Sequence, residues 1–152
     1  MIEPQTDTLT RSEWLAALLD LPVYCAGDEA DCTADRIREM NALLRLVPVG
    51  ADLAGTRALN AARLAALLGP DGGESAVLAM LGHDTGFLLS RSGDGHSFAT
   101  LALPGAVPEQ SCSGSTPALA LIGALALSLY EAQGSTRPLT RRRRVDGYSL
   151  LH

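Results

Sequence analysis

Three cysteines and three histidines are the side chains of this 152-residue chain best suited to metal binding or nucleophilic catalysis. Six residues separate Cys25 from Cys32, and twelve separate His83 from His96. Structural zinc modules use closer pairs, with roughly two to four residues between cysteines and three to five between histidines. We therefore expect neither a metal site nor any other cofactor.

A cysteine nucleophile would need a thiolate beside an imidazole that a carboxylate orients. The carboxylate next to His83 in the sequence would point to the opposite face of an extended strand. Asp94 and His96 share one side of an expected hairpin tip, where solvent reaches both. We predict that the chain is not an enzyme. The alternative is a small Cys/His-dependent hydrolase that uses Cys25 or Cys112.

Small polar residues from Ser111 to Thr116 precede the last expected helix. Backbone N–H groups at a helix N-terminus bind anions readily. However, the chain contains no Gly-rich phosphate loop and no GxSxG motif. A loop that ends in a helix-capping residue explains these residues equally well.

Acidic residues gather before and within the first turn of an expected helix near residue 33. Carboxylates there complement the helix dipole, by about 0.3–1 kcal/mol for each charge. They also form an acidic surface that suits a basic partner or mimics nucleic acid. We predict that the following acidic residues contact a partner: Asp28, Glu29, Asp31 and Asp35.

The basic residues, all of them arginines, are concentrated at the C-terminal end. Residues 1–136 hold 7 Arg and 16 acids, a net charge of −9, whereas residues 137–152 hold 5 Arg and 1 acid, a net charge of +4. Without lysine, Schiff-base chemistry and a P-loop lysine are excluded. Consecutive guanidinium groups repel one another and need a counter-charge. We therefore predict a basic arm over 137–152 that binds a partner through these residues: Arg141, Arg142, Arg143, Arg144 and Tyr148.

Hydrophobic patterning predicts helices first, then strands, then one more helix. Thr10 and Glu13 form a capping-box pattern for a helix that we expect Pro22 to end. Further helices are expected near residues 33–47 and 56–68, followed by strands at 75–81, 86–91 and 95–103. Thr116 and Pro117 then begin an apolar helix that extends to about Gln133, and we expect it to be the central buried one.

The third expected strand is apolar on both sides, because Phe98, Thr100 and Ala102 point one way and Ala99, Leu101 and Leu103 the other. A sheet that is apolar on both sides needs cover on both sides. The chain therefore predicts an α+β fold, a three-layer α/β/α sandwich in which helices cover both faces of a short antiparallel sheet. Residues 1–136 form its single domain.

The stretch from Gly95 to Gln133 carries a resemblance to a known family. A hairpin strand, a loop of small residues and a helix that begins Thr116-Pro117-Ala118-Leu119-Ala120-Leu121 follow one another. This order resembles the C-terminal end of small phage-encoded proteins of the phage ABA-sandwich type. The resemblance implies a sandwich fold and an accessory role in a phage or prophage. It implies no catalytic residue.

The N-terminus has no basic or apolar leader, so we expect a cytoplasmic protein with reduced thiols. The apolar run 117–130 reaches about 21 Å as a helix, short of the ~30 Å hydrocarbon core of a bilayer, so we expect no membrane span. We predict a non-enzymatic phage or bacterial accessory protein that binds, and in its sharper form inhibits, a host or defence protein. An assembly or adaptor protein is the softer form. A homo-oligomer formed through the arm stays open, and nucleic acid is a less favoured partner.

Overall fold

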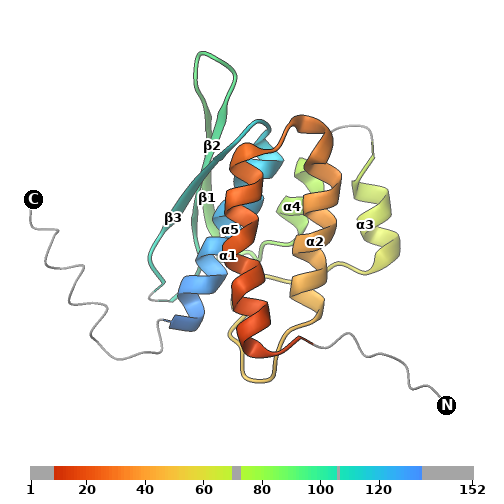
Figure 1. Cartoon of the computed structure of the whole chain (residues 1–152), viewed down its shortest axis with the longest axis vertical. Helices are drawn as coiled ribbons and strands as arrows, with labels where there is room; N and C mark the ends of the chain where they lie inside the picture. Colours follow the sequence, from red (N-terminus) through yellow and green to blue (C-terminus); the bar gives the residue numbers. More distant parts are fainter. Residues whose placement is uncertain (1–8, 70–72, 106, 135–152) are drawn as a thin grey trace, which may run out of the picture.

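The computed structural model describes residues 9–69, 73–105 and 107–134 (Figure 1). Helices come first, three strands follow, and a long helix ends the described part. The elements in chain order are α1 (Arg11–Gly27), the short 3-10 helix η1 (Ala30–Cys32), α2 (Thr33–Arg45), α3 (Ala61–Leu67), α4 (Glu74–Ala79), β1 (Gly86–Arg91), β2 (Ser97–Ala102), β3 (Gln110–Gly114) and α5 (Pro117–Gly134).

Helix α5 lies at the centre of the core, as the sequence predicts. Side chains on all sides of it are buried, including Leu121, Ile122 and Leu125. Thr116 caps its first turn, because its Oγ1 accepts a hydrogen bond from the N–H of Leu119 (3.1 Å). Strands β2 and β3 pack on one side of α5, and α1 and α2 pack on the other. A helix so enclosed needs no polar face.

The three strands form an antiparallel sheet in the order β1-β2-β3. The β1–β2 register places Leu88 opposite Thr100, and the β2–β3 register places Thr100 opposite Ser111. The Oγ atoms of Thr100 and Ser111 lie 2.8 Å apart, within hydrogen-bonding distance. Residues of β2 alternate between buried and exposed positions, so the sheet has an inner face toward α5 and an outer face.

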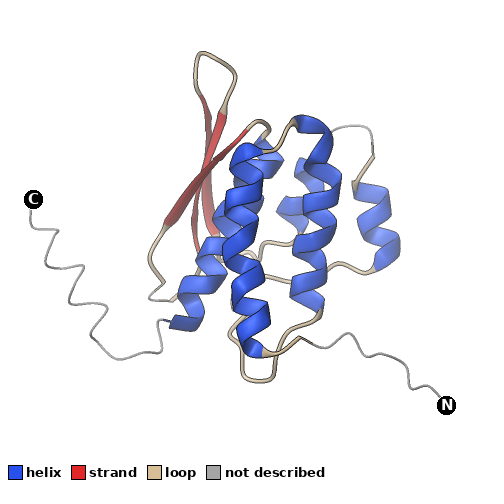
Figure 2. Cartoon of the chain, in the orientation of Figure 1, coloured by secondary structure: helices blue, strands red, loops and turns tan. Residues whose placement is uncertain are grey.

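The α+β class is confirmed, but the described residues do not form a three-layer sandwich. All the helices lie on the inner side of the sheet (Figure 2). On β2 the inner residues Ala99 and Leu101 are buried, whereas Phe98 on the outer face is 43% exposed. Neither face of β2 is charged, which is the feature that led us to expect cover on both sides. The second cover is missing from the described part of this chain.

Two of the predicted local structures are wrong. The expected strand at 75–81 is mostly helix α4, and its buried residues Ala76, Val77 and Met80 follow helical spacing. A short apolar run has no period that separates a strand from a buried helix. The predicted loop of small residues before the last helix is largely strand β3. A Cβ at Gly114 would lie 2.8 Å from the backbone N of Ala120, so glycine allows β3 to approach α5 closely.

Helix α1 begins as predicted and ends later than predicted. Thr10 and Glu13 form the capping box, with bonds of 3.1 and 3.0 Å in the two directions. Pro22 does not end the helix, which continues to Gly27. Pro22 is buried, and a Cβ at Gly123 of α5 would lie 3.5 Å from its Cα. Packing against α5 thus offsets the hydrogen bond that a proline removes from a helix.

The α2 and α3 boundaries also differ from the sequence prediction. The residue before α2 makes no side-chain cap, and the Oγ1 of Thr33 instead donates to the carbonyl of Ala30 (2.7 Å). α3 begins at Ala61 after the cap Asn60, later than expected. The intervening loop is tied down by Asn41, which exchanges two hydrogen bonds with the backbone of Leu59 (2.7 and 2.9 Å). Side-chain clamps on loops leave no periodic signal in a sequence.

Candidate interaction surface

The outer face of the sheet is uncovered by the described helices and carries two exposed large hydrophobic side chains. Strand β2 contributes Phe98, which is 43% exposed, and β1 contributes Leu88, which is 73% exposed. None of the outward-facing residues carries a charge. They are Gly86, Leu88, Ser90, Phe98, Thr100, Ala102, Ser111 and Ser113.

A sheet face without charges differs from an ordinary solvated face, which alternates apolar residues inward with polar and charged residues outward. The centre of a protein–protein interface is depleted of charge and enriched in aromatic residues. The ring of His96 lies edge-on to Phe98, with centroids 5.9 Å apart, and extends the apolar surface toward the hairpin. This face shares two features with a contact surface, the lack of charge and an exposed aromatic ring, and its remaining polar groups are hydroxyls of Ser and Thr.

A second uncovered feature is the edge of strand β1 that faces away from β2. The N–H of Ser92 donates to the carbonyl of His96 (2.9 Å), which makes this a hydrogen-bonded pair of the ladder. Because such pairs alternate along antiparallel strands, the backbone N–H and C=O groups of Phe87, Leu89 and Arg91 point away from β2. Among the described residues, no strand pairs with this edge.

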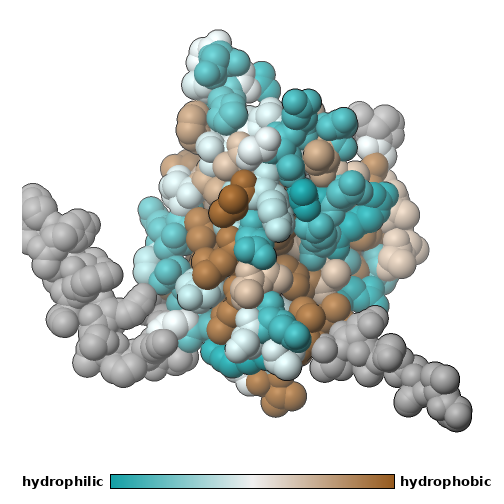
Figure 3. Space-filling view, in the orientation of Figure 1, coloured by the Kyte–Doolittle hydropathy of each residue, from teal (hydrophilic) through white to brown (hydrophobic). Residues whose placement is uncertain are grey.

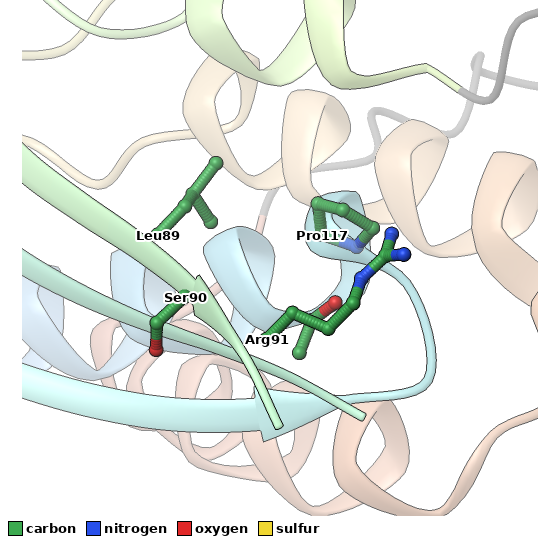
Figure 4. A pocket seen from close by; sticks show the side chains of 5 residues that line it. Leu89, Ser90, Arg91 and Pro117 are labelled. Carbon is green, nitrogen blue, oxygen red and sulfur yellow. The ribbon is translucent and has the colours of Figure 1, made fainter. Parts of the chain in front are cut away.

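Those same three residues face the inner side of the sheet, but α5 does not cover them fully. Phe87 is 42% exposed, Leu89 is 39% exposed, and Arg91 is also exposed. Leu89 and Arg91 line a pocket of about 200 Å³ together with Ser90, Ser97 and Pro117. In Figure 4 the side chains of Leu89 and Arg91 lie on the Pro117 side of the β1 ribbon, whereas Ser90 points the other way.

The hairpin tip beyond this pocket is organised by Asp94. Its Oδ1 accepts hydrogen bonds from the hydroxyl of Ser92 and from the backbone N–H of His96 (3.0 Å). These two donors lower the pKa of Asp94. The carboxylate thus holds the turn together, and it makes no hydrogen bond with the imidazole ring of His96 among the described contacts.

The predicted acidic residues surround the turn between α1 and α2. Asp28 is half-buried and accepts a hydrogen bond from the Nε of Arg36 (2.6 Å). Arg36 also donates to Glu39 (2.9 Å), and the hydrogen bond that Arg36 donates to Asp28 is the main cause of its raised pKa. Asp35 lies 3.6 Å from Arg38 on the exposed surface.

Glu29 and Asp31 are exposed at this turn. Of the predicted acidic contact residues, these two leave their carboxylates most open to a partner, while Asp28 has a structural role in positioning α2. The turn is anchored to the start of α5, since the Oγ of Ser115 donates to the carbonyl of Asp28 (3.0 Å). The predicted contact residues of the arm, Arg141 to Arg144 and Tyr148, lie outside the described residues.

Burial raises the pKa of two of the cysteines, Cys25 and Cys112. Burial brings the pKa of Cys25 to about 12, and the neighbouring thiol of Cys112 adds to the shift. No hydrogen bond joins a cysteine to His83 or His96 within the described part of the chain. Across the same ranges, no three His, Cys, Asp or Glu side chains gather as a metal site would require.

The exposed apolar residues belong to no chemical motif in the sequence. The chain shows them in β2, where neither set of alternating residues is polar, and in β1, where Phe87, Leu88 and Leu89 are consecutive. Helix α1 contributes further apolar exposure at Leu19 and Val23. Figure 3 shows hydrophobic side chains gathered on the side of the molecule that carries α1.

Within its described ranges, the chain has no helix with the length and apolar character needed to cross a bilayer. No protein-family model matches the chain, and searches of curated proteins and of solved structures give no significant match.

Proposed function

We propose that this chain is a non-enzymatic protein-binding protein and that the outer face of its sheet, centred on Leu88 and Phe98, is the contact surface. The observation that carries this proposal is the combination of exposure with a complete lack of charge on that face. Partial burial of two such side chains contributes roughly 1–2 kcal/mol each. The occupant is a partner protein that presents an apolar surface and completes the sandwich.

We propose an accessory role for this surface, in one of two forms. The more specific form is inhibition of a host or defence protein in a phage or bacterial context. The less specific form is assembly or adaptor activity. Glu29 and Asp31 at the α1–α2 turn, and the arginines of the arm, would supply charged contacts at the rim of the interface. Rim charges chiefly set the association rate and the specificity.

The hydrolase alternative receives less support from the same contacts. A thiol with a pKa of about 12 is protonated at neutral pH, and Cys25 is buried. A catalytic cysteine needs the opposite environment, with a lowered pKa and access to substrate. His83 is exposed near the start of β1, and His96 packs against Phe98.

The test compares three tagged full-length proteins expressed in the native host: wild type, the double variant Leu88→Asp/Phe98→Asp, and the control Val49→Asp. Val49 is an apolar residue that is fully exposed in a loop. The control therefore also replaces an apolar side chain by an aspartate, but at a position outside the sheet. Mass spectrometry then identifies the proteins that co-purify with each one.

We expect the wild type and the control to retain a shared partner and the double variant to lose it. All three proteins should be folded at the assay temperature, as circular dichroism checks, although the double variant should melt lower because Phe98 is only 43% exposed and packs against His96. A partner retained by a folded double variant would contradict the proposal.

A further inference from the structure

The residues along the free edge of β1 determine which side chains an additional strand would need in order to pair with it. Phe87, Leu89 and Arg91 have free backbone groups and point to the inner side of the sheet. In an antiparallel pair, residues directly opposite one another point to the same side. An added strand therefore needs, in its own N-to-C direction, an acid opposite Arg91 and apolar residues opposite Leu89 and Phe87. The matching pattern is an acidic residue, any residue, an apolar residue, any residue and an apolar residue.

The surroundings of Arg91 favour a carboxylate. Arg91 makes no ion pair with the described residues. Ser97, opposite Arg91 on β2, is 1% exposed and lines the pocket, and its hydroxyl makes no hydrogen bond within the described ranges. Pro117 brings the N-terminal end of α5 to the same pocket, and the first turn of that helix contains no acid. A guanidinium, a hydroxyl donor and the positive end of a helix dipole together suit a carboxylate.

The chain contains this pattern after α5, in the run Asp146-Gly147-Tyr148-Ser149-Leu150. We propose that residues 146–150 add to the free edge of β1 in the same molecule as a fourth, antiparallel strand. The register places Asp146 opposite Arg91. Tyr148 then lies opposite Leu89, and Leu150 lies opposite Phe87.

The length of the chain after α5 permits this pairing. Strands β1 and β3 both run antiparallel to β2, and α5 follows β3 directly, so α5 runs back toward the end of the sheet where β1 begins, over β2 and β3. The path to Arg91 covers about the length of α5, roughly 27 Å for its 18 residues, and about two strand spacings across the sheet, roughly 10 Å, which together make a diagonal of about 29 Å. The eleven residues 135–145 reach about 36 Å when extended.

Charge complementarity favours the same path. The acidic α1–α2 turn and the Arg91 pocket both adjoin the N-terminal end of α5, since Thr33 and Thr116 lie 3.2 Å apart through their hydroxyls and Pro117 lines the pocket. Residues 141–144 would approach Glu29 and Asp31 just before the added strand begins. A second copy of β1 fits less well, because Gly86–Arg91 contains no acid to face Arg91.

This inference does not depend on the proposed partner, and its test needs none. Hydrogen exchange is measured on the full-length protein at the amides of Phe87, Leu89 and Arg91, with the amides of α5 as the internal reference. The variants are Arg91→Asp, Asp146→Arg and the two combined. Glu109→Arg, an exposed acid before β3, is the charge-matched control.

We expect the three amides to be protected in the wild type and in the control. Each single reversal should speed their exchange by about 2- to 10-fold, the effect of losing one surface ion pair and adding a repulsion. The combined swap should restore protection. Unprotected amides in the wild type, or a swap that does not restore protection, would overturn the proposal. Protection that depends on protein concentration would overturn pairing within one molecule.

Discussion

Gly123 is the point at which three elements meet at the centre of the core. It lies in α5, and a Cβ added there would press on the Sγ of Cys112 in β3, well inside contact distance. The same Cβ would lie 3.1 Å from the Cβ of Cys112 and 3.5 Å from the Cα of Pro22 in α1. We therefore expect Gly123→Ala to destabilise the protein through one dominant contact, the sulfur of Cys112.

The magnitude follows from two opposing effects. Forcing a methyl group into a packed core costs about 1–3 kcal/mol. Replacing glycine by alanine inside a helix contributes about 1 kcal/mol in the favourable direction. Gly123→Ala should therefore lower the free energy of unfolding by up to about 2 kcal/mol. In a Cys112→Ala background the sulfur is gone, and the same change should be neutral or stabilising by up to about 1 kcal/mol.

The assay is urea denaturation of the wild type, the two single variants and the double variant. The coupling energy between the two sites should be about 1–3 kcal/mol. Gly27→Ala serves as the control, because a Cβ at Gly27 meets nothing within 4 Å and should show no coupling to Cys112. Additive effects of Gly123→Ala and Cys112→Ala would refute the packing argument.

Three further predictions concern the clamps and the thiols. Asn41→Ala should lower the free energy of unfolding by about 1–3 kcal/mol in urea, because it leaves the buried backbone N–H of Leu59 unpaired while the carbonyl still accepts from Arg45, whereas loss of the exposed helix cap in Asn60→Ala should cost only about 1 kcal/mol. The lowered pKa of Asp94 means that its stabilising effect is present above the ordinary carboxyl pKa and is lost as the pH falls through the lowered value. The melting temperatures of wild type and Asp94→Asn should accordingly differ at pH 7 and converge once the pH falls below the lowered pKa of Asp94; a difference that does not shrink as the pH falls would contradict this. Iodoacetamide at pH 7.4 should modify Cys32 before Cys25, whose thiol is buried and has a pKa of about 12, and replacing either described histidine by alanine should leave that rate unchanged.

Local signals with a direct physical cause made parts of the fold predictable. The capping pair Thr10 and Glu13, the Thr116 cap and the hairpin at residues 92–96 each satisfy backbone groups within a few residues of themselves. The burial of α5 followed from its uniformly apolar sequence. In each case the deciding interaction is short-range or depends on composition alone.

The errors arose where distant contacts decide the structure. Pro22 remains helical because it packs on α5, about a hundred residues later in the chain. Strand β3 has little hydrophobic character, but it pairs with β2 and approaches α5 at Gly114. In the sequence, the exposed sheet face shows only as a strand whose two alternating sets of residues are both largely apolar. That pattern predicts that both faces are covered, but it does not say whether this chain or another molecule covers the second face.

The position of α5 at the end of the described chain has a consequence for biosynthesis. Helix α1 is made first, yet the surface that buries it belongs to a helix made more than a hundred residues later. During translation, the face of α1 that packs on α5 stays uncovered until α5 is made, so early folding of the N-terminal half has little to stabilise it. A ribosome that stalls before α5 would release a fragment with exposed hydrophobic surface, which chaperones and proteases would recognise.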